Sequence, residues 1–294
     1  MLHRVQTASL NVAYYRHGAA GGPSIVLLHG FPYAPSSYDD AARALAQEGF
    51  DVIIPYLRGY GPTRFRDPAG FRSGEQAALG KDAIDLIGAL DLERPIVAGY
   101  DWGGRAACVA SALRPDLVGG LVTVCGYNIF CPPVTAPLDP RVEHMLWYQY
   151  YLHMPRGRVM LEQHRDAFCR YLWEIWSPGW AFSDTQFDAA SVAFRNADFV
   201  EVVLHSYRHR AGLAPGDPSL LDVAAELERQ PSIGVPTMVL HGDRDMAPLA
   251  MSLDRSRFTA FWERRVIAGA GHNLPQEAPS AFAAAITDLA AHIG

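Results

Sequence analysis

The sequence has few cysteines, and their spacing indicates neither a zinc site nor a redox centre. The four are Cys108, Cys125, Cys131 and Cys169; they include no Cys-x-x-Cys pair, and the eleven histidines include no His-Glu-x-x-His motif. Zinc sites and dithiol centres depend on such spacings. The pattern therefore predicts reduced thiols and gives no support to a metal enzyme, and no cofactor is implied.

Long basic runs and long apolar runs are also missing. Lys and Arg number 25 against 31 Asp and Glu, which gives a formal net charge of −6 without any Lys/Arg-rich cluster. This balance disfavours a nucleic-acid partner. No apolar stretch approaches the ~20 residues of a membrane span, and Met1–Thr7 carry no signal-peptide core. We therefore expect a cytoplasmic protein with no membrane partner.

The first part of the 294-residue chain alternates strand and helix patterns. Short apolar runs bounded by Gly, Pro or charged residues predict buried strands, and Ala/Leu-rich stretches predict the helices between them. Such alternation is typical of a parallel sheet with helices on both faces. The expected strands are 12–16, 24–29, 51–55, 94–98 and 121–125, and the expected helices are 36–47, 74–90 and 105–113.

The pattern changes after Gly126. Residues 127–230 contain no convincing buried-strand run and are rich in Trp and Tyr at spacings compatible with helices. Strand patterns return at 236–241 and 264–268, followed by a helix at 280–293. We therefore expect an α/β core formed by residues 1–126 and 231–294, interrupted by a helical lid at 127–230.

The sharpest motif is Gly99-Tyr-Asp101-Trp-Gly103, between a predicted strand and a predicted helix. A Gly-x-nucleophile-x-Gly elbow in this setting exposes the central side chain above the sheet, because the small residues let strand and helix pass closely. The central residue is usually Ser; here it is Asp101. Gly-x-Asp-x-Gly also occurs in ordinary loops, so this motif alone leaves both interpretations open.

Later motifs favour the elbow. Asp245 follows one late strand and His272 follows the last, in the chain order nucleophile, acid, histidine. Asp243 is the less favoured alternative acid. After the early strand, His29-Gly-Phe31-Pro contributes the Phe31 amide to an oxyanion hole, with the amide after the nucleophile as its second donor. We expect the His29 ring to have a structural role.

These motifs resemble the epoxide hydrolase and dehalogenase branch of the α/β-hydrolases over nearly the whole chain. The resemblance implies Asp101 as nucleophile, Asp245 and His272 completing the triad, and Phe31 and Trp102 as oxyanion amides. It also implies an aspartyl-ester intermediate that water hydrolyses.

An opening epoxide needs a proton donor, whereas halide needs only weak N–H donors. Within the lid, the resemblance points to Tyr148 and Tyr207 as the ring-opening phenols. Tyr150 and Tyr151 compete with Tyr148 for the first position. Trp147 and Tyr150 are expected to contact substrate.

Arg105 leaves two interpretations open. It stands where fluoroacetate dehalogenases have one of two clamp arginines, while Trp102 replaces the other. It either binds an acidic substrate or pairs with a buried acid, and the structural role is the one we expect. Phe31 stands where many haloalkane dehalogenases have a halide-binding Asn, which disfavours that activity without excluding it.

The sequence therefore predicts an epoxide hydrolase with an apolar small-molecule substrate, suggested by the aromatic lid. A haloalkane or haloacid dehalogenase with the same nucleophile is the alternative. A non-catalytic ligand-binding homologue is a third, since fold alone does not imply turnover. Both a monomer and a homodimer fit the sequence.

Overall fold

The computed structural model describes residues 1–133, 137–245 and 255–293. Its centre is a sheet with strand order β1-β2-β4-β3-β6-β7-β8-β9, and β5 pairs with β2. Strands β3, β4 and β6–β9 run parallel, and β1, β2 and β5 pair antiparallel. The strands are β1 (Leu2–Gln6), β2 (Leu10–His17), β3 (Ser24–Leu28), β4 (Asp51–Pro55), β5 (Arg64–Phe65), β6 (Ile96–Gly99), β7 (Gly120–Val124), β8 (Thr237–Gly242) and β9 (Trp262–Ile267).

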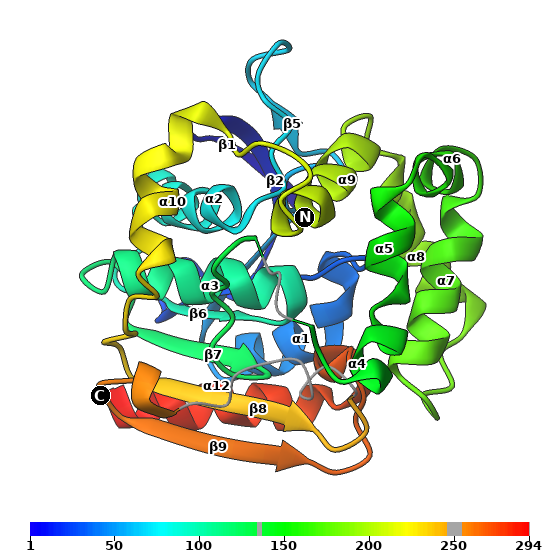
Figure 1. Cartoon of the computed structure of the whole chain (residues 1–294). Coiled ribbons are helices and arrows are strands. Elements are labelled where there is room, and N and C mark those ends of the chain that lie inside the picture. The colour runs from blue at the N-terminus through cyan, green and yellow to red at the C-terminus, as the bar shows by residue number, and fades with distance from the viewer. Residues whose placement is uncertain (134–136, 246–254, 294) are drawn as a thin grey trace.

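Helices cover both faces of the sheet, as expected from the alternation (Figure 1). On one face, α1 (Asp39–Gln47) packs against α12 (Pro279–Ile293); on the other, α2 (Gln76–Ala89) packs against α3 (Asp101–Leu113). The central strands are buried on both sides, which explains why β3, β4 and β7 are continuous apolar runs rather than alternating ones.

A helical segment is inserted between β7 and β8, and its first helices form a layer beyond the strand ends (Figure 1). This layer contains α4 (Pro140–Met145), α5 (Trp147–His153), α6 (Pro155–Gln163), α7 (Arg165–Trp176), α8 (Asp184–Ser191) and α9 (Phe199–Arg210). The later α10 (Leu221–Glu228) packs against α2. The short α11 (Leu274–Glu277) precedes α12.

The sequence patterns missed β1 and β5 at the antiparallel edge, and they placed the start of α3 four residues too late. Trp-Gly-Gly discourages a helix on propensity alone, but packing overrides it. A Cβ on Gly103 would lie 1.8 Å from the Leu28 carbonyl oxygen, so only glycine lets α3 approach β3 this closely. Separately, none of the described helices is long and apolar enough to cross a membrane.

Candidate active site

Asp101 lies at a sharp turn between β6 and α3. Its φ is +50°, a left-handed conformation that a non-glycine residue adopts only under constraint. Gly30 makes room for it, because a Cβ at position 30 would lie 2.6 Å from the Asp101 Cβ. The turn holds the carboxylate beyond the carboxyl ends of the parallel strands, where ligands bind in open α/β sheets.

The Asp101 carboxylate is held in its ionised form. The Phe31 N–H donates to Asp101 Oδ1 at 2.7 Å. Burial alone would raise the pKa of Asp101, but His272, Arg105 and the Phe31 amide outweigh it and lower the pKa below its usual value. The Trp102 amide follows in the first turn of α3 and stays a predicted second oxyanion donor.

His272 and Asp245 face Asp101 from loops after β9 and β8. His272 Nδ1 lies 3.2 Å from Asp245 Oδ2 and 3.3 Å from Oδ1. The Cys125 thiol, just after β7, also donates to Asp245 Oδ2 at 3.2 Å. The alternative acid, Asp243, is exposed, and its Oδ1 accepts a hydrogen bond from the Gly269 N–H instead.

The imidazole of His272 lies between two carboxylates. Its Nε2 is 3.9 Å from Asp101 Oδ2, longer than a hydrogen bond but close enough for strong charge attraction. Burial alone would lower the pKa of His272, but Asp245 and Asp101 outweigh it and raise the pKa to about 10. The free site therefore holds an imidazolium at neutral pH.

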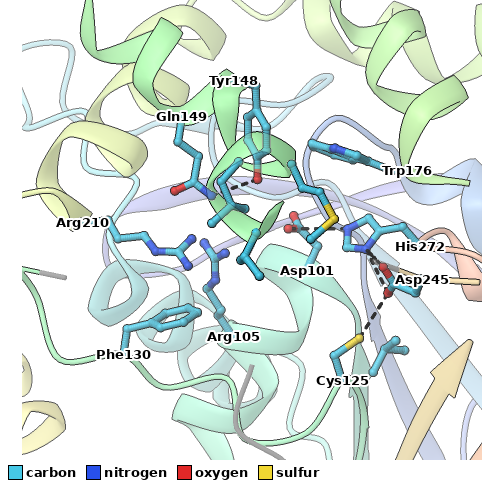
Figure 2. Close-up of a pocket in the computed structure, with 14 residues that line it drawn as sticks. Asp101, Arg105, Cys125, Phe130, Tyr148, Gln149, Trp176, Arg210, Asp245 and His272 are labelled. Atoms are coloured by element: carbon cyan, nitrogen blue, oxygen red, sulfur yellow. Dashed lines mark hydrogen bonds and ion pairs between the residues drawn. The ribbon is translucent and has the colours of Figure 1, made fainter. Parts of the chain in front are cut away.

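A cavity of about 80 Å³ opens over Asp101 and His272 (Figure 2). The inserted helices contribute Val142, Met145, Leu146, Tyr148, Gln149, Trp176 and Arg210; the core contributes Asp101, Arg105, Val124, Cys125, Phe130, Asp245 and His272. The lining is thus apolar on several sides with charged groups near the nucleophile.

The two predicted phenols lie beside each other but differ in access. Tyr148 lines the cavity, and its hydroxyl accepts from Gln149 Nε2 at 3.1 Å. The Tyr207 ring packs behind it, with ring centroids 5.5 Å apart. The Tyr207 hydroxyl is buried and has no hydrogen-bond partner among the described residues. Burial raises the pKa of both phenols, which keeps them protonated as donors.

Two residues predicted to contact the substrate, Trp147 and Tyr150, do not line the cavity. Trp147 packs against Tyr151, Phe168 and Tyr171 within the inserted helices rather than lining the cavity. Tyr150 is 48% exposed and its hydroxyl bonds Glu143. Both residues lie on sides of α5 turned away from Tyr148, since successive helical residues are about 100° apart.

The contacts of His29 join two loops of the core and match the structural role expected for its ring. The ring is buried, Nδ1 lies 3.0 Å from the Gly30 carbonyl oxygen, and Nε2 accepts from the Leu57 N–H at 3.2 Å. Burial lowers the pKa of His29 to about 4, so the neutral ring joins two loops.

Two cavity residues, Arg210 and Phe130, were not predicted from the sequence. Arg210 lies three residues after Tyr207 in α9, and that helical spacing could have revealed it. Trp176, at the end of α7, contacts the His272 ring with centroids 5.2 Å apart. Phe130 lies in a loop after β7 and carries no sequence signal. The residues in the described ranges contain no group of three His, Cys, Asp or Glu placed to hold a metal ion.

Comparison with known proteins identifies the fold family. The model of the alpha/beta hydrolase fold matches residues 23–279. A Klebsiella pneumoniae structure, provisionally described as an epoxide hydrolase, is 38% identical with a TM-score of 0.94, covering 98% of this chain and 96% of that one.

Two curated proteins match shorter stretches. The AB hydrolase superfamily protein YfhM of Bacillus subtilis is 34% identical over 136 residues, 46% of this chain and of its own. Epoxide hydrolase B of Mycobacterium tuberculosis is 35% identical over 152 residues, 47% of this chain and 42% of its own. The chain thus spans about half the length of the curated relatives it matches.

Proposed function

The chain belongs to the alpha/beta hydrolase fold family, in the branch that contains epoxide hydrolases, and we propose that it opens a small epoxide to a vicinal diol through an ester on Asp101. The observation that supports this most is the geometry at the elbow. An ionised Asp101 lies 3.9 Å from His272 of the His272–Asp245 pair, and both line a cavity that a phenol, Tyr148, also lines. A carboxylate, unlike a serine, can displace a leaving group from an sp³ carbon.

In the first step, an Asp101 oxygen attacks one epoxide carbon and the ring C–O bond breaks. The freed oxygen takes a proton from a phenol, with Tyr148 and Tyr207 as the proposed donors. The product is an alkyl ester of Asp101 that carries a neighbouring hydroxyl. The inserted helices act as a lid that keeps bulk water from competing with this step.

In the second step, a water molecule attacks the carbonyl carbon of the ester and passes a proton to His272. The amides of Phe31 and Trp102 stabilise the oxyanion that forms. Collapse of this intermediate breaks the bond to the alkyl oxygen, which takes the proton from His272 and leaves as the diol. Asp101 returns as a carboxylate that contains the oxygen of water, and the second proton of that water passes to His272, which restores the imidazolium of the free site.

The protonation of His272 fits this sequence. In the free site the negative charge of Asp101 stabilises the protonated form of His272. The ester is neutral, so this stabilisation is lost when it forms. The pKa of His272 therefore falls when the ester forms, and the ring becomes a base when a base is required. The proton that leaves His272 restores the phenol that protonated the opened ring.

Trapping the ester tests the proposal. In a His272→Gln variant the second step stops, so intact-protein mass spectrometry after exposure to glycidol should show an adduct of the whole epoxide. The same variant with Asp101→Asn should show none. An adduct that survives loss of Asp101, or wild-type diol production without any adduct in the single variant, would overturn the ester mechanism.

Replacing Tyr207 with Phe tests the second phenol. The change removes one hydroxyl and keeps the packing against Phe31 and Trp102. We expect adduct formation from the epoxide to slow by about 10²-fold, the usual contribution of general acid catalysis. An unchanged rate would reassign Tyr207 to packing.

Dehalogenation is the second candidate, because two indoles lie at the site. Trp176 lines the cavity, and Trp102 Nε1 is buried without a hydrogen-bond partner among the described residues. Indole N–H groups could hold a departing halide. Halide release from chloroacetate or a chloroalkane, with no turnover of epoxides, would favour this candidate over the first.

A further inference from the structure

Two arginines share one side of the cavity. Arg105 lies one turn after Asp101 on the same face of α3, and Arg210 is the last residue of α9. Both line the cavity, and Figure 2 shows their guanidinium groups on the side of Asp101 away from His272. They stack on the same ring, since the guanidinium carbons of Arg105 and Arg210 lie 4.9 and 4.0 Å from the Phe130 centroid.

Neither guanidinium has a carboxylate partner among the described residues. Arg105 is only 8% exposed, and its Nε is buried without a hydrogen-bond partner among the described residues. The Nη1 atom of Arg210 is likewise buried without such a partner. The other buried arginine of the core is different, since Arg58 makes two hydrogen bonds with Asp82 at 2.6 and 2.7 Å. Arg58, which lies outside the cavity, thus has the carboxylate partner that Arg105 and Arg210 lack.

Two neighbouring cations, Arg105 buried and Arg210 partly buried, are unfavourable in the free protein. Burial and then the charge of Arg105 lower the pKa of Arg210 to about 10, which still leaves it charged at neutral pH. The Phe130 ring offsets part of this cost through cation–π contact. An anion between the two groups would remove the repulsion and supply the missing hydrogen-bond acceptors.

We propose that Arg105 and Arg210 bind a carboxylate of the substrate, so that the preferred substrate is a small epoxide bearing a carboxylate group. This inference rests on the proposed function for the epoxide part and on the arginine pair for the carboxylate part. A planar guanidinium matches a carboxylate in shape and donates hydrogen bonds that a neutral substituent does not fully use. This proposal adds one charged group to the largely apolar substrate expected from the sequence.

The size of the cavity points to a short molecule. A volume of about 80 Å³ has room for roughly five to eight water-sized groups. Glycidate, an epoxide with a carboxylate on one ring carbon, has this size. Glycidamide is its neutral isostere, which makes the two a matched pair for measuring the contribution of the charge.

A purely structural role for Arg210 makes an opposite prediction about stability. A cation at the C-terminus of α9 would interact favourably with the helix dipole, and its loss would destabilise the fold. If Arg210 instead awaits a ligand, Arg210→Gln removes an uncompensated, partly buried charge and leaves the melting temperature unchanged or raised. Arg210→Lys keeps the charge and loses the planar fork.

Binding is measured separately from catalysis with propanoate, which has no leaving group, and propanamide, its neutral isostere. Calorimetric titration of the wild-type protein should show tighter binding of propanoate. Arg210→Gln should weaken propanoate binding by about 10- to 100-fold, as expected for a hydrogen-bonded charge, and leave propanamide unchanged. Arg195→Gln removes an exposed arginine that pairs with Asp166 and serves as the control.

The outcomes separate the two proposals. Equal affinity for propanoate and propanamide, or the same loss of propanoate binding in the control, would overturn the carboxylate site. Propanoate binding that depends on Arg210, with turnover of neither glycidate nor glycidamide, would retain the site and overturn the epoxide hydrolase. Faster turnover of glycidate, with the preference lost in Arg210→Gln and reduced in Arg210→Lys, supports both.

Discussion

Asp101→Asn should lower the pKa of His272, and the size of the change follows from the structure. The charges of Asp101 and His272 are separated by 3.9 Å. At about 4 Å, one pair of unit charges contributes roughly 1 kcal/mol in water and roughly 4 kcal/mol at an effective dielectric constant of about 20. Since 1.36 kcal/mol corresponds to a pKa change of one, the pKa of His272 should fall by about 1 to 3.

The assay is an NMR titration of protein labelled with ¹³C in the histidine rings. The His272 signal is identified by its absence from a His272→Gln variant. Asp243→Asn is the matched control, because Asp243 lies in the same loop as the triad acid but is exposed and bonds the Gly269 amide. An unchanged pKa in Asp101→Asn, or an equal fall in the control, would refute the coupling that makes ester formation release the base.

Three further changes have expected outcomes. Gly30→Ala places a Cβ against the nucleophile and should lower kcat by about 10²-fold. The control is Gly88→Ala in α2, where a Cβ meets nothing within 4 Å and the activity should be kept. Equal losses of kcat in the two variants would contradict the steric explanation. Asp82→Asn leaves the buried Arg58 without its carboxylate partner and should lower the free energy of unfolding in urea by about 3 to 5 kcal/mol. Asp40→Asn, which breaks an exposed ion pair with Arg43, should lower it by less than about 1 kcal/mol. Because the pKa of His272 is raised from 6.5 to about 10 in the folded state, its contribution to the free energy of unfolding should be complete below pH 6.5 and disappear as the pH rises through about 10. The measurement is the difference in unfolding free energy between the wild type and His272→Gln as a function of pH. A difference that grows with pH would contradict this prediction.

The parallel core could be predicted because its signals are local. Each central strand is a short apolar run that ends in a turn, and Asp101, Asp245 and His272 each follow such a run. Parallel strands end at one edge of the sheet, so residues distant in sequence meet there without any knowledge of side-chain packing. The structure places all three side chains at that edge, with His272 between the two carboxylates.

The inserted helices could be predicted only in part. Their aromatic content indicated helices, but which side of α5 faces the cavity depends on how α5 packs against α7 and α9. Given Tyr148 as the inward residue, helical geometry already excludes Tyr150, two positions later, and favours Leu152, which is buried. The same geometry connects Tyr207 with Arg210, three positions later. Contacts across segments, such as both arginines on Phe130, have no local signal.

The charges of the site explain why an anionic substrate and a protonated base belong together. In the free site Arg105, Arg210 and the His272 imidazolium exceed the two carboxylates by one positive charge. A substrate carboxylate cancels that excess, so binding leaves a neutral group of charges in a buried place, where an uncompensated charge is costly. Ester formation moves the negative charge of Asp101 to the ring oxygen and, through proton transfer, to the phenol, and the imidazolium proton then neutralises it. Loss of the imidazolium proton before the ester forms is thus opposed more strongly with an epoxy acid than with its neutral isostere, because the substrate carboxylate raises the pKa of the imidazolium, whereas the neutral isostere leaves the surplus of positive charge in place.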